Sequence, residues 1–126
     1  KFDMLMTSPP YVGLIDYHEQ HRYAYELLDL PRQDEKEVGA AFKGKSVRAH
    51  EEYLGCIEAV LTNARKYLSN DGVVVIVIGD KEGLYTDEMA RTMGFRTEER
   101  LERHVNRRTG RRNGDFFESV LIWRLD

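Results

Sequence analysis

The residues best suited to chemistry stand near the start of the chain, where Thr7-Ser8-Pro9-Pro10-Tyr11 follows an apolar run over residues 2–6. A proline cannot donate to a sheet ladder, and it pushes the preceding residue into extended geometry, so a strand over this run must end near Thr7. Ser8 and the carbonyls after it are then held at the carboxyl end of a strand, where ligands bind in open α/β sheets. A rigid turn with a hydroxyl, bare carbonyls and one ring is suited to capture a flat group that carries an NH2.

Ser-Pro-Pro-Tyr after an apolar strand resembles the catalytic motif of S-adenosylmethionine-dependent amino-methyltransferases, which methylate the exocyclic amine of cytosine or adenine in DNA. The Ser form is more typical of the cytosine-N4 enzymes and the Asp form of the adenine-N6 enzymes. The resemblance implies a catalytic set of Ser8, Pro9, Pro10 and Tyr11. In that set the Ser8 side chain and the Pro9 carbonyl accept hydrogen bonds from the target amine. Tyr11 stacks on a base that has been rotated out of the duplex.

Two alternatives remain for the same residues. A Pro-Pro pair can simply end a strand, and Tyr11 can be an aromatic packed under the turn. No strong general base is evident in the motif, so its chemistry would rest on positioning and electrostatics.

Length and composition predict one α/β domain over residues 1–126. The chain has 126 residues, 41% of them apolar and 33% charged, which is enough for a single core. Cys56 is the only cysteine, which excludes an internal disulfide and a cysteine-based zinc site. Its helical spacing predicts a small buried residue in a reducing, cytoplasmic protein. No apolar run has membrane-spanning length, and we expect no signal peptide ahead of the first strand.

The charge is distributed unevenly. The net charge is −3, yet residues 103–112 hold five arginines and no acid, which leaves −8 on the remainder. We expect this basic segment to form the turn between the last two strands, at the same sheet edge as the Pro-Pro turn. There it would contact the phosphates of double-stranded DNA, through Asn106, Arg107, Arg108, Arg111 and Arg112. The alternative is a solvated, charged hairpin tip.

Periodicity and turn signals predict the order strand, helix, strand, helix, strand, strand. Asp16 and Glu19 have the spacing of a capping box and predict a helix to about Leu28, followed by a polar loop over residues 31–45. Ser46 is the expected N-cap of a long helix to about Leu68, and Asn70-Asp71-Gly72 is an expected turn. The other predicted elements are a central strand over 73–78, a short helix over 86–93, and strands over 96–105 and 116–124. The buried stripe of the long helix is predicted as Val47, Tyr53, Leu54, Ile57, Val60, Leu61, Ala64 and Leu68.

This order resembles the second half of the methyltransferase Rossmann-like sheet, which closes with an antiparallel hairpin. The resemblance implies a partial, mixed sheet in a three-layer αβα arrangement. The family's glycine-rich cofactor loop, an aromatic-x-Gly-x-Gly pattern, is absent, and Gly55, Gly72 and Gly79 do not reproduce it. Because the chain also begins at Lys1 almost directly in a strand, we expect a catalytic half whose cofactor half lies before or after it. Alone, this segment should bind S-adenosylmethionine poorly and be inactive.

Three functions compete. The first is a cytosine-N4 DNA methyltransferase of restriction–modification type. The second is an adenine-N6 DNA, RNA or protein amide methyltransferase, and the third is a non-catalytic α/β module that binds nucleic acid through its arginines. We also expect self-association, because an unpaired strand over residues 2–6 is an exposed apolar edge.

Three further residues carry weaker signals. His18 and His21 are three apart, which is compatible with a metal pair, but no carboxylate or cysteine completes a set and no metal is proposed. Asp80 follows the central strand and is best interpreted as a turn residue. Phe116 and Phe117 begin the last strand, where alternation sends one into the core and the other to the opposite face.

Overall fold

The computed structural model describes residues 1–105 and 116–126 and contains a four-stranded mixed sheet with helices. The strands are β1 (Phe2–Thr7), β2 (Leu68–Ile78), β3 (Phe95–Val105) and β4 (Phe116–Leu125). The α-helices are α1 (Tyr17–Gln20), α2 (Arg22–Leu27), α3 (Val47–Arg65) and α4 (Asp87–Thr92), and two 3-10 turns are η1 (Asp34–Lys36) and η2 (Ala41–Lys43).

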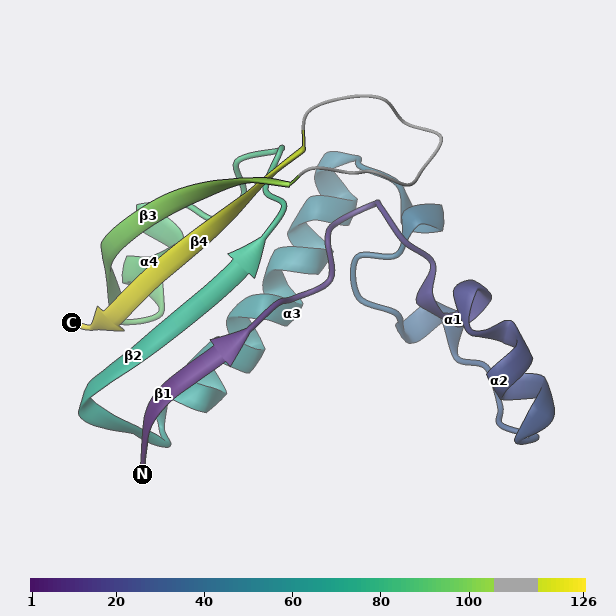
Figure 1. The fold of residues 1–126 in the computed structure, drawn as a ribbon, viewed down its shortest axis with the longest axis horizontal. Coiled ribbons are helices and arrows are strands. Elements are labelled where there is room, and N and C mark those ends of the chain that lie inside the picture. Colours follow the sequence, from purple (N-terminus) through teal and green to yellow (C-terminus); the bar gives the residue numbers. More distant parts are fainter. Residues whose placement is uncertain (106–115) are drawn as a thin grey trace. The chain divides into compact units, whose positions relative to one another are not determined.

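The sheet has the strand order β1-β2-β4-β3 (Figure 1). β1 pairs parallel to β2, whereas β4 pairs antiparallel to both β2 and β3. The predicted α/β class, the mixed sheet and the closing antiparallel hairpin are thereby confirmed. The valine-rich stretch of β2 lies between β1 and β4, which explains why its sequence is almost wholly β-branched.

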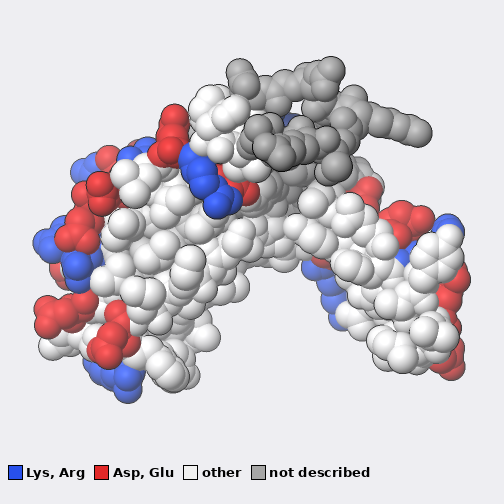
Figure 2. Space-filling view, viewed as in Figure 1, with Lys and Arg blue, Asp and Glu red and all other residues white. Residues whose placement is uncertain are grey.

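One face of this sheet carries the core. Val74, Ile76, Leu121 and Trp123 are fully buried on it. In Figure 1 both α4 and the second half of α3 lie behind the sheet on one side. The opposite face is largely uncharged over β1 and β2 in Figure 2. Among the described residues the sheet therefore has one helical layer, and the second layer of the expected αβα arrangement stays a prediction.

The chain divides into two compact units. The first, called the sheet unit here, comprises residues 1–9 and 57–126, and the second, called the loop unit, comprises residues 10–56. Helix α3 contributes its first ten residues to the loop unit and the rest to the sheet unit. The expectation of a single domain over residues 1–126 stays a prediction.

The long helix begins where the sequence indicates. The Ser46 Oγ accepts a hydrogen bond from the Ala49 N–H at 3.2 Å, which confirms Ser46 as its N-cap. Its end differs from the prediction, because α3 stops at Arg65 and Leu68 already belongs to β2. Residues 70–72 are likewise part of β2, at the point where its pairing with β1 shifts register.

The predicted stripe of α3 is partly wrong. Tyr53, Ile57 and Leu61 are buried at intervals of four, whereas Val47 and Val60 are 74% and 64% exposed. The buried face of α3 is narrower than the spacing pattern predicted. Only a short row at i, i+4 and i+8 is buried, and the two valines lie outside it. Cys56 is exposed rather than buried, which corrects the prediction for the single cysteine. Among the described residues no helix is both long and apolar enough to cross a membrane.

Candidate functional site

The first half of the Ser8–Tyr11 motif lies at the carboxyl edge of the sheet unit. Ser8 is exposed and Pro9 is buried directly after β1 ends at Thr7. Because β1 is parallel to β2 with Thr7 opposite Ile76, the ends of both strands meet at this edge. Ser8 and the residues after Ile78 therefore lie at the same end of the sheet, as the sequence predicted.

The hairpin strands bring their termini to the same edge. Ser119 of β4 lies opposite Ile78, and the first residue of β4, Phe116, pairs with the last residue of β3, Val105. The predicted phosphate contacts, Asn106, Arg107, Arg108, Arg111 and Arg112, lie outside the described residues. The residues that flank this segment are at the edge where Ser8 and Pro9 lie.

The two phenylalanines that begin β4 point to opposite faces. Phe116 is 7% exposed, and the Lys81 Nζ lies 5.8 Å from the centre of its ring. Phe117 is 49% exposed and packs against the His104 ring with 5.1 Å between centroids. The expected alternation is confirmed, with Phe116 as the core member.

Asp80 has a structural role at this edge. One carboxylate oxygen accepts the Leu84 N–H at 2.7 Å, and the other accepts the Tyr85 N–H at 3.0 Å. The two bonds close the loop between β2 and α4, because they satisfy backbone donors that would otherwise face an open turn. This agrees with the interpretation of Asp80 as a turn residue.

The second half of the motif belongs to the loop unit, whose boundary falls between Pro9 and Pro10. The Tyr53 hydroxyl donates a hydrogen bond to the Pro10 carbonyl at 2.8 Å. Tyr53 is 2% exposed on α3, so a buried side chain holds this carbonyl. Tyr11 is half-buried, and its own carbonyl accepts the Leu14 N–H at 3.3 Å in a turn.

The segment after the motif is joined to residues 37–44 by several hydrogen bonds. The Gly13 N–H donates to the Gly39 carbonyl at 2.8 Å, the Ala41 N–H donates to the Ile15 carbonyl at 3.1 Å, and the Phe42 N–H donates to Asp16 Oδ1 at 2.9 Å. These bonds link two stretches of chain about 26 residues apart, as Asp16 and Phe42 are. The predicted polar loop therefore holds the exit from the Pro-Pro turn in place.

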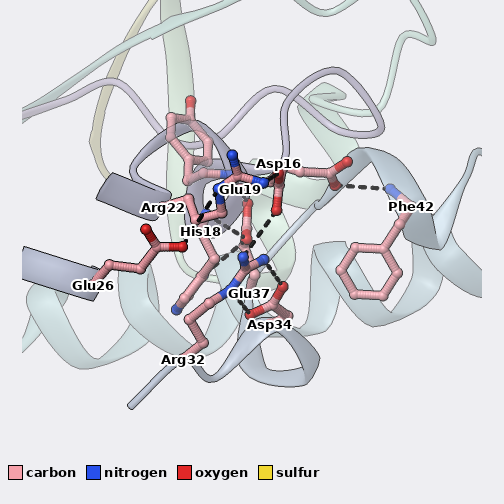
Figure 3. A network of polar contacts seen from close by, with 10 residues as sticks. Asp16, His18, Glu19, Arg22, Glu26, Arg32, Asp34, Glu37 and Phe42 are labelled. Carbon is pink, nitrogen blue, oxygen red and sulfur yellow. Dashed lines mark hydrogen bonds and ion pairs between the residues drawn. The ribbon is translucent and has the colours of Figure 1, made fainter. Parts of the chain in front are cut away.

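Glu37 belongs to a network of polar contacts that includes Asp16, His18, Glu19 and Arg32 (Figure 3). Its carboxylate accepts the backbone N–H groups of Tyr17 and His18, and His18 Nδ1 lies 2.9 Å from the same group. Burial by itself would raise the pKa of Glu37, but the hydrogen bonds from Tyr17 and His18 outweigh it and hold this pKa below its ordinary value. Glu37 is the only charged side chain among the described residues that is buried.

This network corrects the predicted capping box. Asp16 stands at the N-cap of α1 but makes no capping bond, because its side chain accepts from Phe42 instead. Glu19 pairs with Arg32 at 2.9 Å rather than with the helix start. The distant Glu37 satisfies the free N–H groups of α1, and the expected single helix to Leu28 is broken at His21 into α1 and α2.

The two histidines of this region differ in burial, because His18 is half-buried and His21 is exposed. His18 stacks on Tyr25 with 5.0 Å between ring centroids and contacts Glu37. His21 is the residue between α1 and α2. In the part of the chain that the structure describes, no group of three His, Cys, Asp or Glu side chains is placed to hold a metal ion.

Sequence reasoning missed Glu37 and the hydroxyl of Tyr53. Tyr53 was placed correctly in the buried stripe, but helical spacing does not reveal the partner of a phenol. One signal was available, since a buried tyrosine hydroxyl nearly always finds a hydrogen-bond acceptor.

Comparison with known proteins identifies a relative of this chain. Over its whole length, the chain is similar to a Type II methyltransferase. That relative, the Type II methyltransferase M.MjaII of Methanocaldococcus jannaschii, is 44% identical over 126 residues, which are 100% of this chain and 24% of the relative. The chain thus spans about a quarter of the length of the curated relative it matches. No family model matches the chain, and no solved structure matches it.

Proposed function

We propose that this chain is the base-capturing part of a DNA methyltransferase that moves a methyl group from S-adenosylmethionine to an exocyclic amine, with cytosine N4 as the target. The observation that carries the proposal is the similarity to a Type II methyltransferase along all 126 residues, and Ser8 and Pro9 at the carboxyl edge of the sheet are consistent with it. Such an enzyme acts on DNA in the cytoplasm, as part of a restriction–modification pair.

The residues of this chain suit the acceptor side of that reaction. The lone pair of an amine on a pyrimidine ring is delocalised, which makes the nitrogen a poor nucleophile. The exposed Ser8 hydroxyl and the Pro9 carbonyl would accept its hydrogens and favour a more tetrahedral nitrogen. Tyr11 would stack on the flipped base, since base–aromatic stacking is worth about 1–3 kcal/mol.

The residues present do not fit the cofactor as a complete site. The sequence has no aromatic-x-Gly-x-Gly segment, and the glycines closest to that role are taken up by other structure. Gly55 is in α3, and Gly72 is in β2, where a Cβ atom would lie 2.8 Å from the Ser69 carbonyl. We therefore place the cofactor site in a part of the protein outside these residues.

The test is methyl transfer by the full-length protein that contains this chain. It is incubated with DNA and S-adenosylmethionine labelled in the methyl group, and the modified nucleosides are separated and identified. We expect N4-methylcytosine from the wild-type protein, a reduced rate for Ser8→Ala, and almost no transfer for Tyr11→Ala. Ser69→Ala is the matched control, because it removes a serine hydroxyl that bonds Asp3 at the start of β2.

The outcomes separate the competing functions. N6-methyladenine, or transfer to RNA alone, would show the same chemistry on another target. DNA binding without transfer under any condition would favour the non-catalytic module. A rate unchanged by both Ser8→Ala and Tyr11→Ala would refute the proposed site.

The basic segment is proposed to bind the DNA phosphates. Replacing Arg107, Arg108, Arg111 and Arg112 by glutamine should weaken binding equally for all DNA sequences. It should also reduce the slope of the logarithm of the binding constant against the logarithm of the salt concentration, by about one unit for each phosphate that is no longer neutralised. An unchanged salt dependence would support the solvated hairpin tip instead.

The edge strand supports a further part of the proposal, which is self-association of the isolated chain. β1 is an outer strand of the sheet, and Phe2, Met4 and Met6 are 68%, 59% and 68% exposed. An unpaired apolar edge is a template for pairing with another chain. Light scattering of the 126-residue chain at high concentration should show dimers or larger species, and Met4→Lys should reduce them.

A further inference from the structure

We propose that Tyr53 is a positioning residue, which sets the direction of Tyr11 by holding the peptide that joins Pro10 to Tyr11. The inference rests on the proposed function, because it gives Tyr11 the task of stacking on the base. It adds a residue on α3, 42 positions along the chain from Tyr11, that never needs to touch the substrate.

Because of the geometry of proline, the direction of the Pro10 carbonyl determines the path of the chain into Tyr11. The proline ring locks φ near about −65°, so ψ is the remaining free torsion of Pro10. That torsion sets both the direction of the Pro10 carbonyl and the start of Tyr11. The Tyr53 Oη lies 2.8 Å from the carbonyl oxygen, so the hydrogen bond that it donates fixes ψ and, with it, the path of the chain into Tyr11.

The Tyr53 ring is itself firmly held. It is 2% exposed, and one of its edges lies against Gly39, where an added Cβ would be only 3.0 Å from Tyr53 Cδ2. Gly39 has φ +69°, a conformation that side-chain-bearing residues rarely adopt. The Gly39 carbonyl also accepts the Gly13 N–H. The same glycine thus packs against the tyrosine and binds the segment that the tyrosine orients.

The bond also assigns the carbonyls of the motif to different tasks. The Pro10 carbonyl accepts from Tyr53 inside the protein, so its orientation is committed to the fold. Capture of the target amine is left to Ser8 and the Pro9 carbonyl. A hydroxyl on α3 therefore separates the structural acceptor from the proposed catalytic ones.

Tyr53→Phe in the full-length protein tests the assignment, because it removes only the hydroxyl and keeps the packed ring. Tyr67→Phe is the matched control, since it removes the same group from a ring that is 58% exposed. The first readout is hydrogen exchange of residues 11–16 by mass spectrometry. We expect faster exchange there in Tyr53→Phe, with the strands of the sheet unit unchanged and Tyr67→Phe like wild type.

The second readout is the rate of methyl transfer. Losing one net hydrogen bond of about 1 kcal/mol corresponds to roughly a fivefold effect. We expect kcat to fall by about that factor while KM for S-adenosylmethionine stays unchanged. Gly39→Ala, which pushes a methyl group against the Tyr53 ring, should speed exchange in the same segment.

Each outcome decides the inference. Unchanged exchange over residues 11–16 in Tyr53→Phe would overturn it. Faster exchange throughout the protein would also overturn it, because it would mean a general loss of stability rather than local positioning. If the wild-type protein transfers no methyl groups, the proposed function fails, while the exchange data still decide whether Tyr53 orders the segment after Pro10.

Discussion

The sheet unit and the loop unit are stabilised by different forces. In the sheet unit the interior is apolar: Trp123 is fully buried, and its ring centroid lies 6.5 Å from that of Tyr85 and 6.1 Å from that of Phe95. In the loop unit a buried carboxylate and backbone bonds between two loops fix the chain. Burial of apolar area is non-directional, whereas each hydrogen bond of the loop unit depends on one particular pairing. The loop unit should therefore be the more sensitive to single polar substitutions and to pH.

The largest expected effect is on the sheet unit. Trp123→Ala leaves a cavity beside Tyr85 and Phe95 and should lower the free energy of unfolding by about 3–5 kcal/mol. Chemical denaturation followed by circular dichroism measures it. Val60→Ala is the control, because this side chain is 64% exposed and its truncation should change stability by less than about 0.5 kcal/mol. A small loss in Trp123→Ala would mean that the sheet does not depend on this aromatic cluster.

The corresponding substitution in the loop unit is Glu37→Gln. It keeps the shape of the side chain but removes the charge that accepts the N–H groups of Tyr17 and His18, so the expected loss is about 1–3 kcal/mol. Hydrogen exchange of residues 17–18 should accelerate, while exchange in β2 and β4 stays slow. Glu35→Gln is the control, because this neighbour is exposed. Equal acceleration in the strands would show that the two units unfold together.

A decrease in pH should distinguish the units without any substitution. The pKa of Glu37 is lowered in the folded chain, so its carboxylate adds stability that is present above the ordinary glutamate pKa of about 4.3. That stability is lost as the pH falls through the lower, folded value. Protonation keeps both oxygens in place, so we expect a smaller effect than that of Glu37→Gln. Trp123, the single tryptophan, reports the sheet unit by its fluorescence, and exchange of residues 17–18 reports the loop unit.

In acid, exchange in the loop unit should rise before the tryptophan signal changes. Glu37→Gln provides the control, because it has no carboxylate at this position to titrate and its loop unit should lose this pH dependence. A simultaneous change of both signals in the wild-type chain would contradict the comparison.

The same contrast explains what the sequence could predict. The β-branched run of β2 and the Ser46 cap depend on neighbours within a few residues, and both were identified. Glu37 was missed because its partners, Tyr17 and His18, are 20 and 19 residues away. Asp16 and Glu19 had the right spacing for a capping box, but both side chains bond to distant residues instead. Local patterns specify elements, whereas the pairing of two loops is decided by tertiary contacts that no short pattern contains.

The candidate site follows the same rule. The position of Ser8 at the carboxyl edge could be predicted, because it needs only a strand that ends at two prolines and pairs parallel to β2. The bond between Tyr53 and Pro10 could not, since it joins residues 43 positions apart. Cys56 was misplaced because a spacing that fits one helical stripe does not say how wide the buried face is.

The smallest loss of stability is expected when one helix cap is removed from each unit. Ser46 accepts the Ala49 N–H at 3.2 Å at the start of α3, and Thr86 accepts the Met89 N–H at 3.1 Å at the start of α4. Each substitution to alanine should cost about 1 kcal/mol, because it frees one backbone donor at a helix start. Thr86→Ala should act on the sheet unit and move the tryptophan transition, since Met89 and Ala90 of α4 are buried. Ser46→Ala should instead speed hydrogen exchange in the first turn of α3 and leave the tryptophan transition close to that of wild type. If both variants moved that transition equally, α3 would transmit the loss along its length, and the two units would behave as one cooperative structure.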